Sequence, residues 1–488
     1  MNPRRVLVLG YGMAGARLAD EIRRRDPDGE RVALTVVGAE PHAAYNRVLL
    51  SAVVAGTMRP ESVRLHDEDW AVRQHVDLRL GAGARRIDRP NRTVELTDGT
   101  TVPYDSLVLA TGSRPWLPPV EGLLADDGDL AEGAMTFRTL DDCDRILDAA
   151  AVGAPVAVLG GGLLGLEAAR GLAGRGNRVT VVHPAGHVME RQLDRGAGRV
   201  LTKTLQSAGI DFRLGRTAAR YLPGDGLKLD DGSHVDADLL VVSTGVRAES
   251  DLASDAGLDV DRGIVVDDAL RTSDGRIHAL GDCARHRGAP GGLVQPAWEQ
   301  ASVLADLLTG TDTAARYRGT SVVTRLKAKG VDLAALGEID PPEPDDADAG
   351  SADETEVVCV DDPSRGRYAK LVVRDDKIAG AIVLGVPDAA ATITQLYDRG
   401  VAVPQDRLAL LLGRSLPPAA APAASPADLP GSAIVCRCNS VSKSKIIEAF
   451  RGGASTADEI ASATRASTGC GSCRDAVCGI ADWLASTG

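Results

Sequence analysis

Two short, unbroken apolar runs, each followed by a glycine-rich turn, repeat one pattern in the first half of the chain. The first run covers residues 6–9 and leads into a turn over 10–15 and a helix-like stretch over 16–25. The second run covers 156–159 and leads into a turn over 160–167. Apolar runs of this length are typical of strands buried in a parallel sheet. The pattern therefore predicts two α/β units.

The glycines of the first turn have separate mechanical roles. Gly10 permits the tight turn, Gly12 lets the backbone approach a pyrophosphate, and Gly15 lets the helix pack on the strand. The N-terminus of that helix then attracts the phosphates. A second strand over 32–37 leads to Glu40, at about the distance where an acid binds ribose hydroxyls. Because these parts occur in the right order, they predict a dinucleotide site rather than an empty glycine turn.

The second turn repeats this arrangement. Gly160, Gly162 and Gly165 stand at the same three positions, so a second dinucleotide can bind by the same physics. The second strand of this unit is predicted over 178–182, which puts the ribose-binding position at or near His183. Neither an acid that favours NADH nor a clear arginine for a 2′-phosphate stands there, so the sequence leaves that preference open. Two such units suggest a bound flavin beside an exchangeable nicotinamide.

The dinucleotide pattern does not continue into the last third of the chain. Strand-like runs occur at 356–360, 370–373 and 378–384, with a turn at 375–377 between the last two. This pattern predicts a small α+β domain. The acidic run over 341–354 inside it has no large apolar side chain, so we interpret it as a solvated loop.

Cysteines gather near the C-terminus, after a proline- and alanine-rich linker predicted over 414–432. Two close pairs stand there, Cys436 with Cys438 and Cys470 with Cys473. Four thiolates can enclose an iron–sulfur cluster or a zinc ion, and the spacing alone leaves both readings open. A predicted helix over 442–451 separates the pairs. We interpret three scattered cysteines as small apolar core residues: Cys143, Cys283 and Cys359.

Composition narrows the classes of partner. The charged residues make up 25% and the formal net charge is −13, which opposes binding to nucleic acids or to anionic lipid. No apolar stretch is long enough for a signal peptide or a membrane span, so we expect a cytoplasmic protein. A small redox partner with a basic face would suit the charge better.

Residues 4–310 resemble the FAD-dependent pyridine-nucleotide oxidoreductases, in which an NAD domain is inserted into a split FAD domain. The likeness rests on the two glycine turns and on further motifs at 107–115, 241–245 and 277–282. It implies a flavin site that includes Thr111 and Gly112. It also implies that Asp282 bonds the ribityl chain of FAD.

Within this family, Glu167 would lie near the nicotinamide and orient the hydride donor. The stretch 40–60 has no cysteine, which argues against disulfide reduction. Instead, 45–51 is similar to the nitrite reductase large subunit and its nitrate reductase relatives. This likeness would put Arg47 near the isoalloxazine, where its charge would stabilise a reduced flavin. Further likenesses to this subgroup occur at 189–194, 296–300, 324–327 and 330–333.

Two charged residues in the first of these stretches, Glu190 and Arg191, are interpreted as part of a solvated helix. The last segment resembles the small helical [2Fe-2S] domain of bacterioferritin-associated ferredoxin, including residues 468–473. The resemblance makes the four paired cysteines the cluster ligands, leaves Cys478 spare, and favours iron over zinc.

The expected fold class is α/β, with two Rossmann-like dinucleotide-binding domains, a small α+β interface domain and a small helical iron–sulfur domain. The expected boundaries are 1–112 with 245–315 for FAD, 113–244 for NAD(P)H, 316–413 for the interface domain, 414–432 for the linker and 433–488 for the [2Fe-2S] domain.

The resemblance implies an electron-transfer subunit of an assimilatory nitrate reductase, which passes electrons from NAD(P)H through FAD to the cluster. The acceptor would be a separate molybdenum catalytic subunit. Because we expect no sirohaem domain in the chain, it would not reduce nitrite alone. Three alternatives stay open: the reductase of a split sirohaem nitrite reductase, a reductase for ferredoxin, rubredoxin or a monooxygenase, and a flavoprotein with a structural zinc docking module.

Overall fold

The computed structural model describes residues 2–288, 292–340, 355–414, 427, 429–436, 441–467 and 473–487. The acidic run, most of the predicted linker, and two predicted ligands, Cys438 and Cys470, lie outside these residues. Within the described ranges, no helix is both long enough and apolar enough to cross a bilayer.

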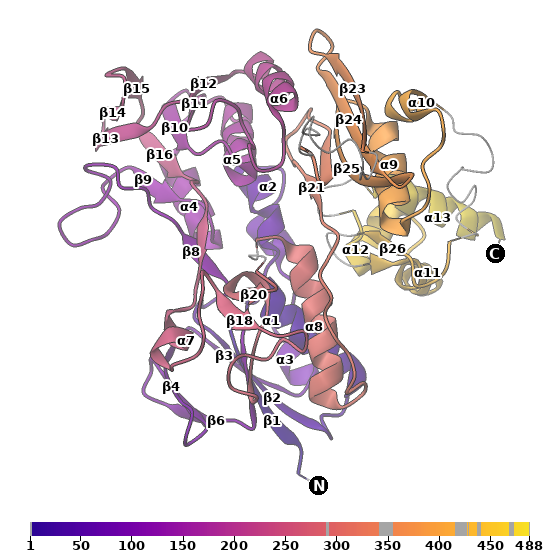
Figure 1. The fold of residues 1–488 in the computed structure, drawn as a ribbon. Helices are drawn as coiled ribbons and strands as arrows, with labels where there is room; N and C mark the ends of the chain where they lie inside the picture. Colours follow the sequence, from indigo (N-terminus) through magenta and orange to yellow (C-terminus); the bar gives the residue numbers. More distant parts are fainter. Residues whose placement is uncertain are drawn as a thin grey trace, which may run out of the picture.

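The first apolar run is the central strand of a five-stranded parallel sheet with the order β19-β7-β1-β2-β3. The helix after the first turn begins at Met13 rather than at residue 16, because it starts directly behind the second glycine. It packs beside α8, near the middle of the lower half of Figure 1. These elements are β1 (Arg4–Leu9), β2 (Val32–Gly38), β3 (Val76–Leu80), β7 (Ser106–Leu109), β19 (Ile277–Ala279), α1 (Met13–Arg25) and α8 (Val294–Thr309).

The second apolar run is the central strand of another five-stranded parallel sheet, with the order β12-β11-β10-β16-β9. Both sheets confirm the prediction of an α/β fold built on buried parallel strands. The elements of this unit are β9 (Ala134–Thr136), β10 (Pro155–Leu159), β11 (Arg178–His183), β12 (Ile210–Leu214), β16 (Leu239–Val242), α4 (Leu140–Ala149), α5 (Leu163–Gly174) and α6 (Arg195–Ser207).

The chain passes between the two units through β8 (Ser113–Pro115) and β17 (Val246–Ala248), which pair antiparallel. Small sheets and short helices complete the two units. The strands are β4 (Ala84–Asp88), β5 (Thr93–Leu96), β6 (Thr101–Pro103), β13 (Ala218–Leu222), β14 (Gly226–Leu229), β15 (His234–Asp236), β18 (Ile264–Val266) and β20 (Ala284–His286). The helices are η1 (Arg47–Leu49), α2 (Leu50–Val54), η2 (Pro60–Val63), α3 (Trp70–Arg73), α7 (Asp251–Asp255) and η3 (Gly281–Cys283).

The third region is an antiparallel sheet with the order β21-β22-β25-β24-β23, covered by α9. The three strands predicted there are confirmed, as is the turn, where Asp375 and Asp376 have φ of 51° and 57°. The elements are β21 (Val323–Arg325), β22 (Leu333–Gly337), β23 (Glu356–Asp362), β24 (Arg367–Arg374), β25 (Lys377–Leu384), α9 (Pro387–Arg399) and α10 (Arg407–Leu411).

The C-terminal segment forms a small, mainly helical unit with its own core, drawn in yellow in Figure 1. Its helix over 442–451 is confirmed. The elements are β26 (Ile434–Cys436), β27 (Val441–Ser442), α11 (Lys443–Arg451), α12 (Ala457–Thr464) and α13 (Arg474–Thr487).

One apolar core joins three parts of the chain and fixes the site. Residues 45–63, which leave the first unit, pack with the helices of the second unit and with the inner face of the third-region sheet. α2 and α5 approach closely at a glycine, and a Cβ at Gly171 would lie only 3.3 Å from Ala55. The segment that carries Arg47 is therefore held between all three.

Candidate functional site

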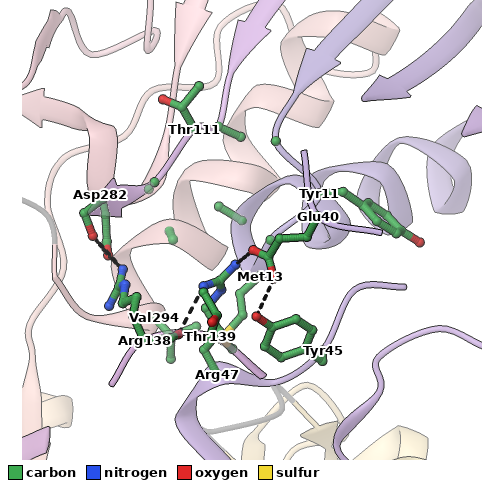
Figure 2. Close-up of a pocket in the computed structure, with 18 of the residues that line it drawn as sticks. Tyr11, Met13, Glu40, Tyr45, Arg47, Thr111, Arg138, Thr139, Asp282 and Val294 are labelled. Atoms are coloured by element: carbon green, nitrogen blue, oxygen red, sulfur yellow. Dashed lines mark hydrogen bonds and ion pairs between the residues drawn. The ribbon is translucent and has the colours of Figure 1, made fainter. Parts of the chain in front are cut away.

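A cavity of about 430 Å³ lies at the carboxyl ends of the first sheet. The residues that follow β1, β2, β7 and β19 all line it, as expected for a ligand site in an open parallel sheet. Figure 2 shows its polar side chains converging from these strand ends and from the second unit.

The glycines of the first turn form a cradle. Gly10 has a φ of 112°, and a Cβ there would lie 2.1 Å from the carbonyl oxygen of Ala110. A Cβ at Gly15 would lie 1.9 Å from the Gly10 carbonyl oxygen, so the turn could not close. Gly12 differs, because its nearest neighbour would be Arg47 Nε at 3.9 Å. The space over Gly12 faces the cavity and fits a pyrophosphate at the start of α1.

Glu40 stands just past β2 and is shared by two neighbours (Figure 2). Tyr45 donates its hydroxyl to Glu40 Oε2 at 2.6 Å, and Arg47 pairs with Oε1. Burial raises the pKa of Tyr45, so its hydroxyl stays a neutral donor. Arg47 also donates to the carbonyl of Arg138 at 3.2 Å. Glu40 and Arg47 thus lie together at the end of the cavity where the ribose and phosphates are expected.

Asp282 lies at the other end of the cavity, in η3. It accepts hydrogen bonds from Ser113 at 2.9 Å and from Arg138 at 2.7 Å. Arg138 Nε is buried and has no hydrogen-bond partner among the described residues, so a donor remains for a bound group. Nearby, Thr111 donates its hydroxyl to the carbonyl of Glu249 at 2.6 Å, and Gly112 has a φ of 76°.

Arg138 was missed in the sequence, although a signal exists. It follows β9 of the second unit and directly precedes Thr139, which caps α4. In this capping box, Asp142 also accepts the backbone N–H of Arg138 at 2.8 Å. A strand end followed by a helix cap marks a rigid position, but only the fold brings it to Asp282.

The second glycine turn repeats the first. Gly160 has a φ of 120°, and a Cβ there would lie 2.2 Å from the carbonyl oxygen of Ser243. A Cβ at Gly165 would lie 2.1 Å from the Gly160 carbonyl oxygen, whereas Gly162, the N-cap of α5, has open space. The turn therefore fits a second pyrophosphate.

The interpretation of Glu190 and Arg191 as part of a solvated helix is wrong, because both lie in a turn. The Glu190 carboxylate pairs with His183 Nε2 at 2.8 Å. The left-handed φ of 53° at Met189 interrupts any helix at this point.

Glu167 is 4% exposed and pairs with Lys327 of the third region. The Lys327 Nζ lies 3.1 Å from Glu167 Oε2, and it also donates to the carbonyl of Val48, which lines the cavity. The backbone N–H of Lys327 donates to the other oxygen of Glu167 at 3.1 Å. This pair lies where the two units and the third region meet. No sequence pattern could link positions 167 and 327.

Two of the predicted cluster ligands are described. Cys436 and Cys473 are 2% and 8% exposed and belong to the core of the C-terminal unit. Cys143 and Cys283 are buried, as expected. The expectation for Cys359 is wrong, because it is exposed on the edge strand β23, where alternate side chains face outward.

Residues 4–303, more than half of the chain, match the family described as pyridine nucleotide-disulphide oxidoreductase. The chain belongs to this family. Residues 323–400 match the rubredoxin NAD+ reductase C-terminal domain, and residues 434–482 match the BFD-like [2Fe-2S] binding domain.

Curated relatives extend the match to almost the whole chain. The nitrite reductase [NAD(P)H] of Bacillus subtilis is 37% identical over 98% of this chain and 57% of its own length. The assimilatory nitrate reductase electron transfer subunit of the same organism is 33% identical over 98% of this chain and 59% of its own length. The chain thus spans under three fifths of each. A chain in the crystal structure of the covalent putidaredoxin reductase–putidaredoxin complex has a TM-score of 0.73 and 26% identity, over 83% of this chain and 95% of that one.

This member of the family is an NAD(P)H-dependent oxidoreductase that uses FAD and a [2Fe-2S] cluster. The match to an iron–sulfur domain decides against the zinc alternative. The glycine cradles and the free donor of Arg138 fit the two nucleotides. The roles assigned to single residues from the resemblance, and the domain boundaries, stay predictions.

Proposed function

We propose that this chain is the electron-transfer subunit of an assimilatory nitrate reductase. Electrons would enter from NAD(P)H and leave through the [2Fe-2S] domain to a separate molybdenum catalytic chain. The supporting observation is the alignment with the electron transfer subunit over 98% of this chain, which includes all three matched domains. Bound FAD supplies the conversion between the electron pairs of a nicotinamide and the single electrons of a cluster.

Different side chains around the cavity would have different roles in binding the flavin and the nicotinamide. Arg138 and Ser113 hold Asp282 in place for the ribityl chain, and the Arg138 charge offsets that of the carboxylate. The Lys327 ammonium pairs with the buried Glu167 side chain and would fix it between the two nucleotide sites. From there, the Glu167 carboxylate would orient the nicotinamide.

The contacts of Arg47 favour a different role from the one that the resemblance implies. Its contacts with Glu40 and its approach to Gly12 favour a role at the adenosine diphosphate end of FAD rather than at the isoalloxazine. A guanidinium there would neutralise phosphate charge beside the start of α1.

Growth on defined nitrogen sources tests the function. A strain that lacks this chain should fail on nitrate and grow normally on ammonium. The wild-type chain should restore growth, whereas a Cys436→Ser/Cys473→Ser variant should not. In vitro, that variant should still reduce ferricyanide with NADH, which shows that its flavin half is intact. Normal growth of the deletion strain on nitrate would overturn the proposal.

A second candidate is the reductase of a separate nitrite reductase. The nitrite reductase relative has the higher identity, 37%, over the same share of the chain. Nitrite as sole nitrogen source separates the candidates. A deletion strain that grows on nitrite but not on nitrate supports the first function, and failure on both favours a role at the nitrite step.

A further inference from the structure

The segment after β11 is fixed to the middle residue of the second glycine turn. The backbone N–H of Gly161 donates to His183 Nδ1 at 3.1 Å, and the Gly161 carbonyl accepts from the N–H of Met189 at 3.0 Å. Met189 is 1% exposed, so packing also holds this position. The stretch 183–190 is therefore built against the turn where the phosphates and ribose of the nicotinamide cofactor are expected.

These contacts define which ring nitrogen of His183 carries the proton. Because His183 Nδ1 accepts from Gly161, the ring proton lies on Nε2, which donates to Glu190 Oε2 at 2.8 Å. The His183 side chain is 7% exposed and the Glu190 side chain 37%. The neutral imidazole fills the space over Gly161, where a Cβ would lie 2.8 Å from the ring. The ring thereby positions the Glu190 carboxylate beside the second glycine turn.

We propose that Glu190 replaces the acid that the end of β11 lacks, and that it selects NADH against NADPH. A carboxylate there accepts hydrogen bonds from the adenosine ribose hydroxyls. The 2′-phosphate of NADPH would bring a second negative group to the same place and be repelled. His183 acts as a positioning residue for Glu190. This inference goes beyond the proposed function, because it concerns the electron donor and not the acceptor.

Among the described residues, the only ion-pair partner of Glu190 is His183. Arg216, whose backbone N–H donates to the His183 carbonyl, pairs its side chain with Asp231 at 2.6 Å. Arg191 follows Glu190 and is exposed. If the chain preferred NADPH to NADH, Arg191 is the residue that would bind the 2′-phosphate. It is therefore the alternative specificity residue that the variants must test.

Binding of nucleotide fragments tests the inference without catalysis. Calorimetry on the purified full chain, loaded with FAD, would compare ADP-ribose with 2′-phospho-ADP-ribose. We expect the wild type to bind ADP-ribose at least about tenfold more tightly, and Glu190→Gln to weaken ADP-ribose binding about tenfold, because a charge-assisted hydrogen bond is lost. Glu190→Arg should raise the affinity for the 2′-phosphate. Glu132→Gln, an exposed carboxylate of the same unit, is the matched control and should change neither.

Steady-state kinetics with ferricyanide as acceptor give the second readout. The ratio of kcat/KM for NADH to that for NADPH should follow the ratio of affinities across the same variants. Unchanged ratios in both Glu190 variants would overturn the inference. So would a wild-type preference for NADPH that Arg191→Gln abolishes. Neither assay involves nitrate or a partner chain, so the outcome is independent of the proposed function.

Discussion

Glu167 is a deeply buried acid near the cavity at the ends of the first sheet, and Lys327 is its only ion-pair partner among the described residues. Breaking one side of such a pair leaves an uncompensated charge in the core. We expect Lys327→Met to lower the free energy of unfolding by about 3 kcal/mol and to slow flavin reduction by NADH. Urea unfolding and stopped-flow absorbance would measure the two effects.

The double variant Glu167→Gln/Lys327→Met provides the control. Without a buried charge it should regain most of the stability while flavin reduction stays slow. Equal stability of the single and double variants would mean that an uncompensated Glu167 charge is not the cause of the lost stability.

His278 gives the fold a pH dependence of its own. It is 5% exposed in β19, and burial, with a contribution from Arg4, lowers the pKa of its imidazole to about 4. The unfolded chain therefore binds the proton more readily between about pH 6.5 and pH 4, so stability falls as the pH falls through this window.

The loss at pH 4 should reach about 3 kcal/mol relative to neutral pH. Urea titrations at several pH values should show that His278→Leu flattens this part of the profile. His75→Asn, which changes an exposed histidine, should leave it intact. An unchanged slope in His278→Leu would show that other groups cause the acid sensitivity.

At the scale of single residues, the sequence analysis identified the residues whose role depends on a local pattern. The glycines and Glu40 follow from spacing along one strand, turn and helix. Arg138 and Lys327 could not be found in this way, because their partners, Asp282 and Glu167, lie more than 140 positions away along the chain. Such pairs exist only after the second unit and the third region have packed.

The glycine turns are the elements whose geometry can be tested most directly. A Cβ at Gly162 would meet nothing within 4 Å, and one at Gly12 would make only an ordinary contact with Arg47 Nε at 3.9 Å. An added methyl group therefore costs little in folding but meets the bound phosphates. We expect Gly12→Ala to lower the FAD content of the purified protein. Gly162→Ala should retain FAD and raise the KM for NADH about tenfold or more. Flavin absorbance per chain and steady-state kinetics would separate the two outcomes.

The equivalent changes at Gly10 or Gly160 serve as contrasts. There a Cβ would meet a backbone carbonyl oxygen at 2.1 or 2.2 Å, so the turn itself would be displaced and the protein should lose stability. If Gly12→Ala and Gly162→Ala both lost FAD, the assignment of one cofactor to each turn would be wrong.

The elements themselves were largely predictable from the sequence. Buried parallel strands are continuous apolar runs, and these runs agree with β1, β2, β10 and β11 to within about two residues. The turn at Met189 was not predictable, because a left-handed methionine has no local sequence signal and is fixed by packing. The wrong prediction of a helix at Glu190 follows from this unpredicted turn.

At the scale of the whole molecule, the C-terminal unit meets the first unit across a cavity of about 700 Å³. Arg465, at the end of α12, lies on one side, and residues 58–69 with His66 lie on the other. Burial lowers the pKa of the Arg465 guanidinium, and the charge of Asp20 opposes that change. Asp20 is itself fixed by His66 Nε2 at 3.1 Å, and His66 stacks on Trp70. We expect the attraction between the charges of Asp20 and Arg465 to guide the [2Fe-2S] domain onto the flavoprotein surface.

If so, reversing one charge should slow electron transfer within the chain. We expect Arg465→Glu to reduce the rate of cluster reduction after mixing with NADH by about tenfold at low salt. Adding Asp20→Arg should restore part of the rate, because the reversed pair attracts again. The difference should shrink in 0.5 M salt, where the Debye length falls to a few ångströms. Arg451→Glu, an exposed change on α11 of the same unit, is the control. Equal rates for Arg465→Glu and Arg451→Glu at low salt would mean that the [2Fe-2S] domain docks without the attraction between Arg465 and Asp20.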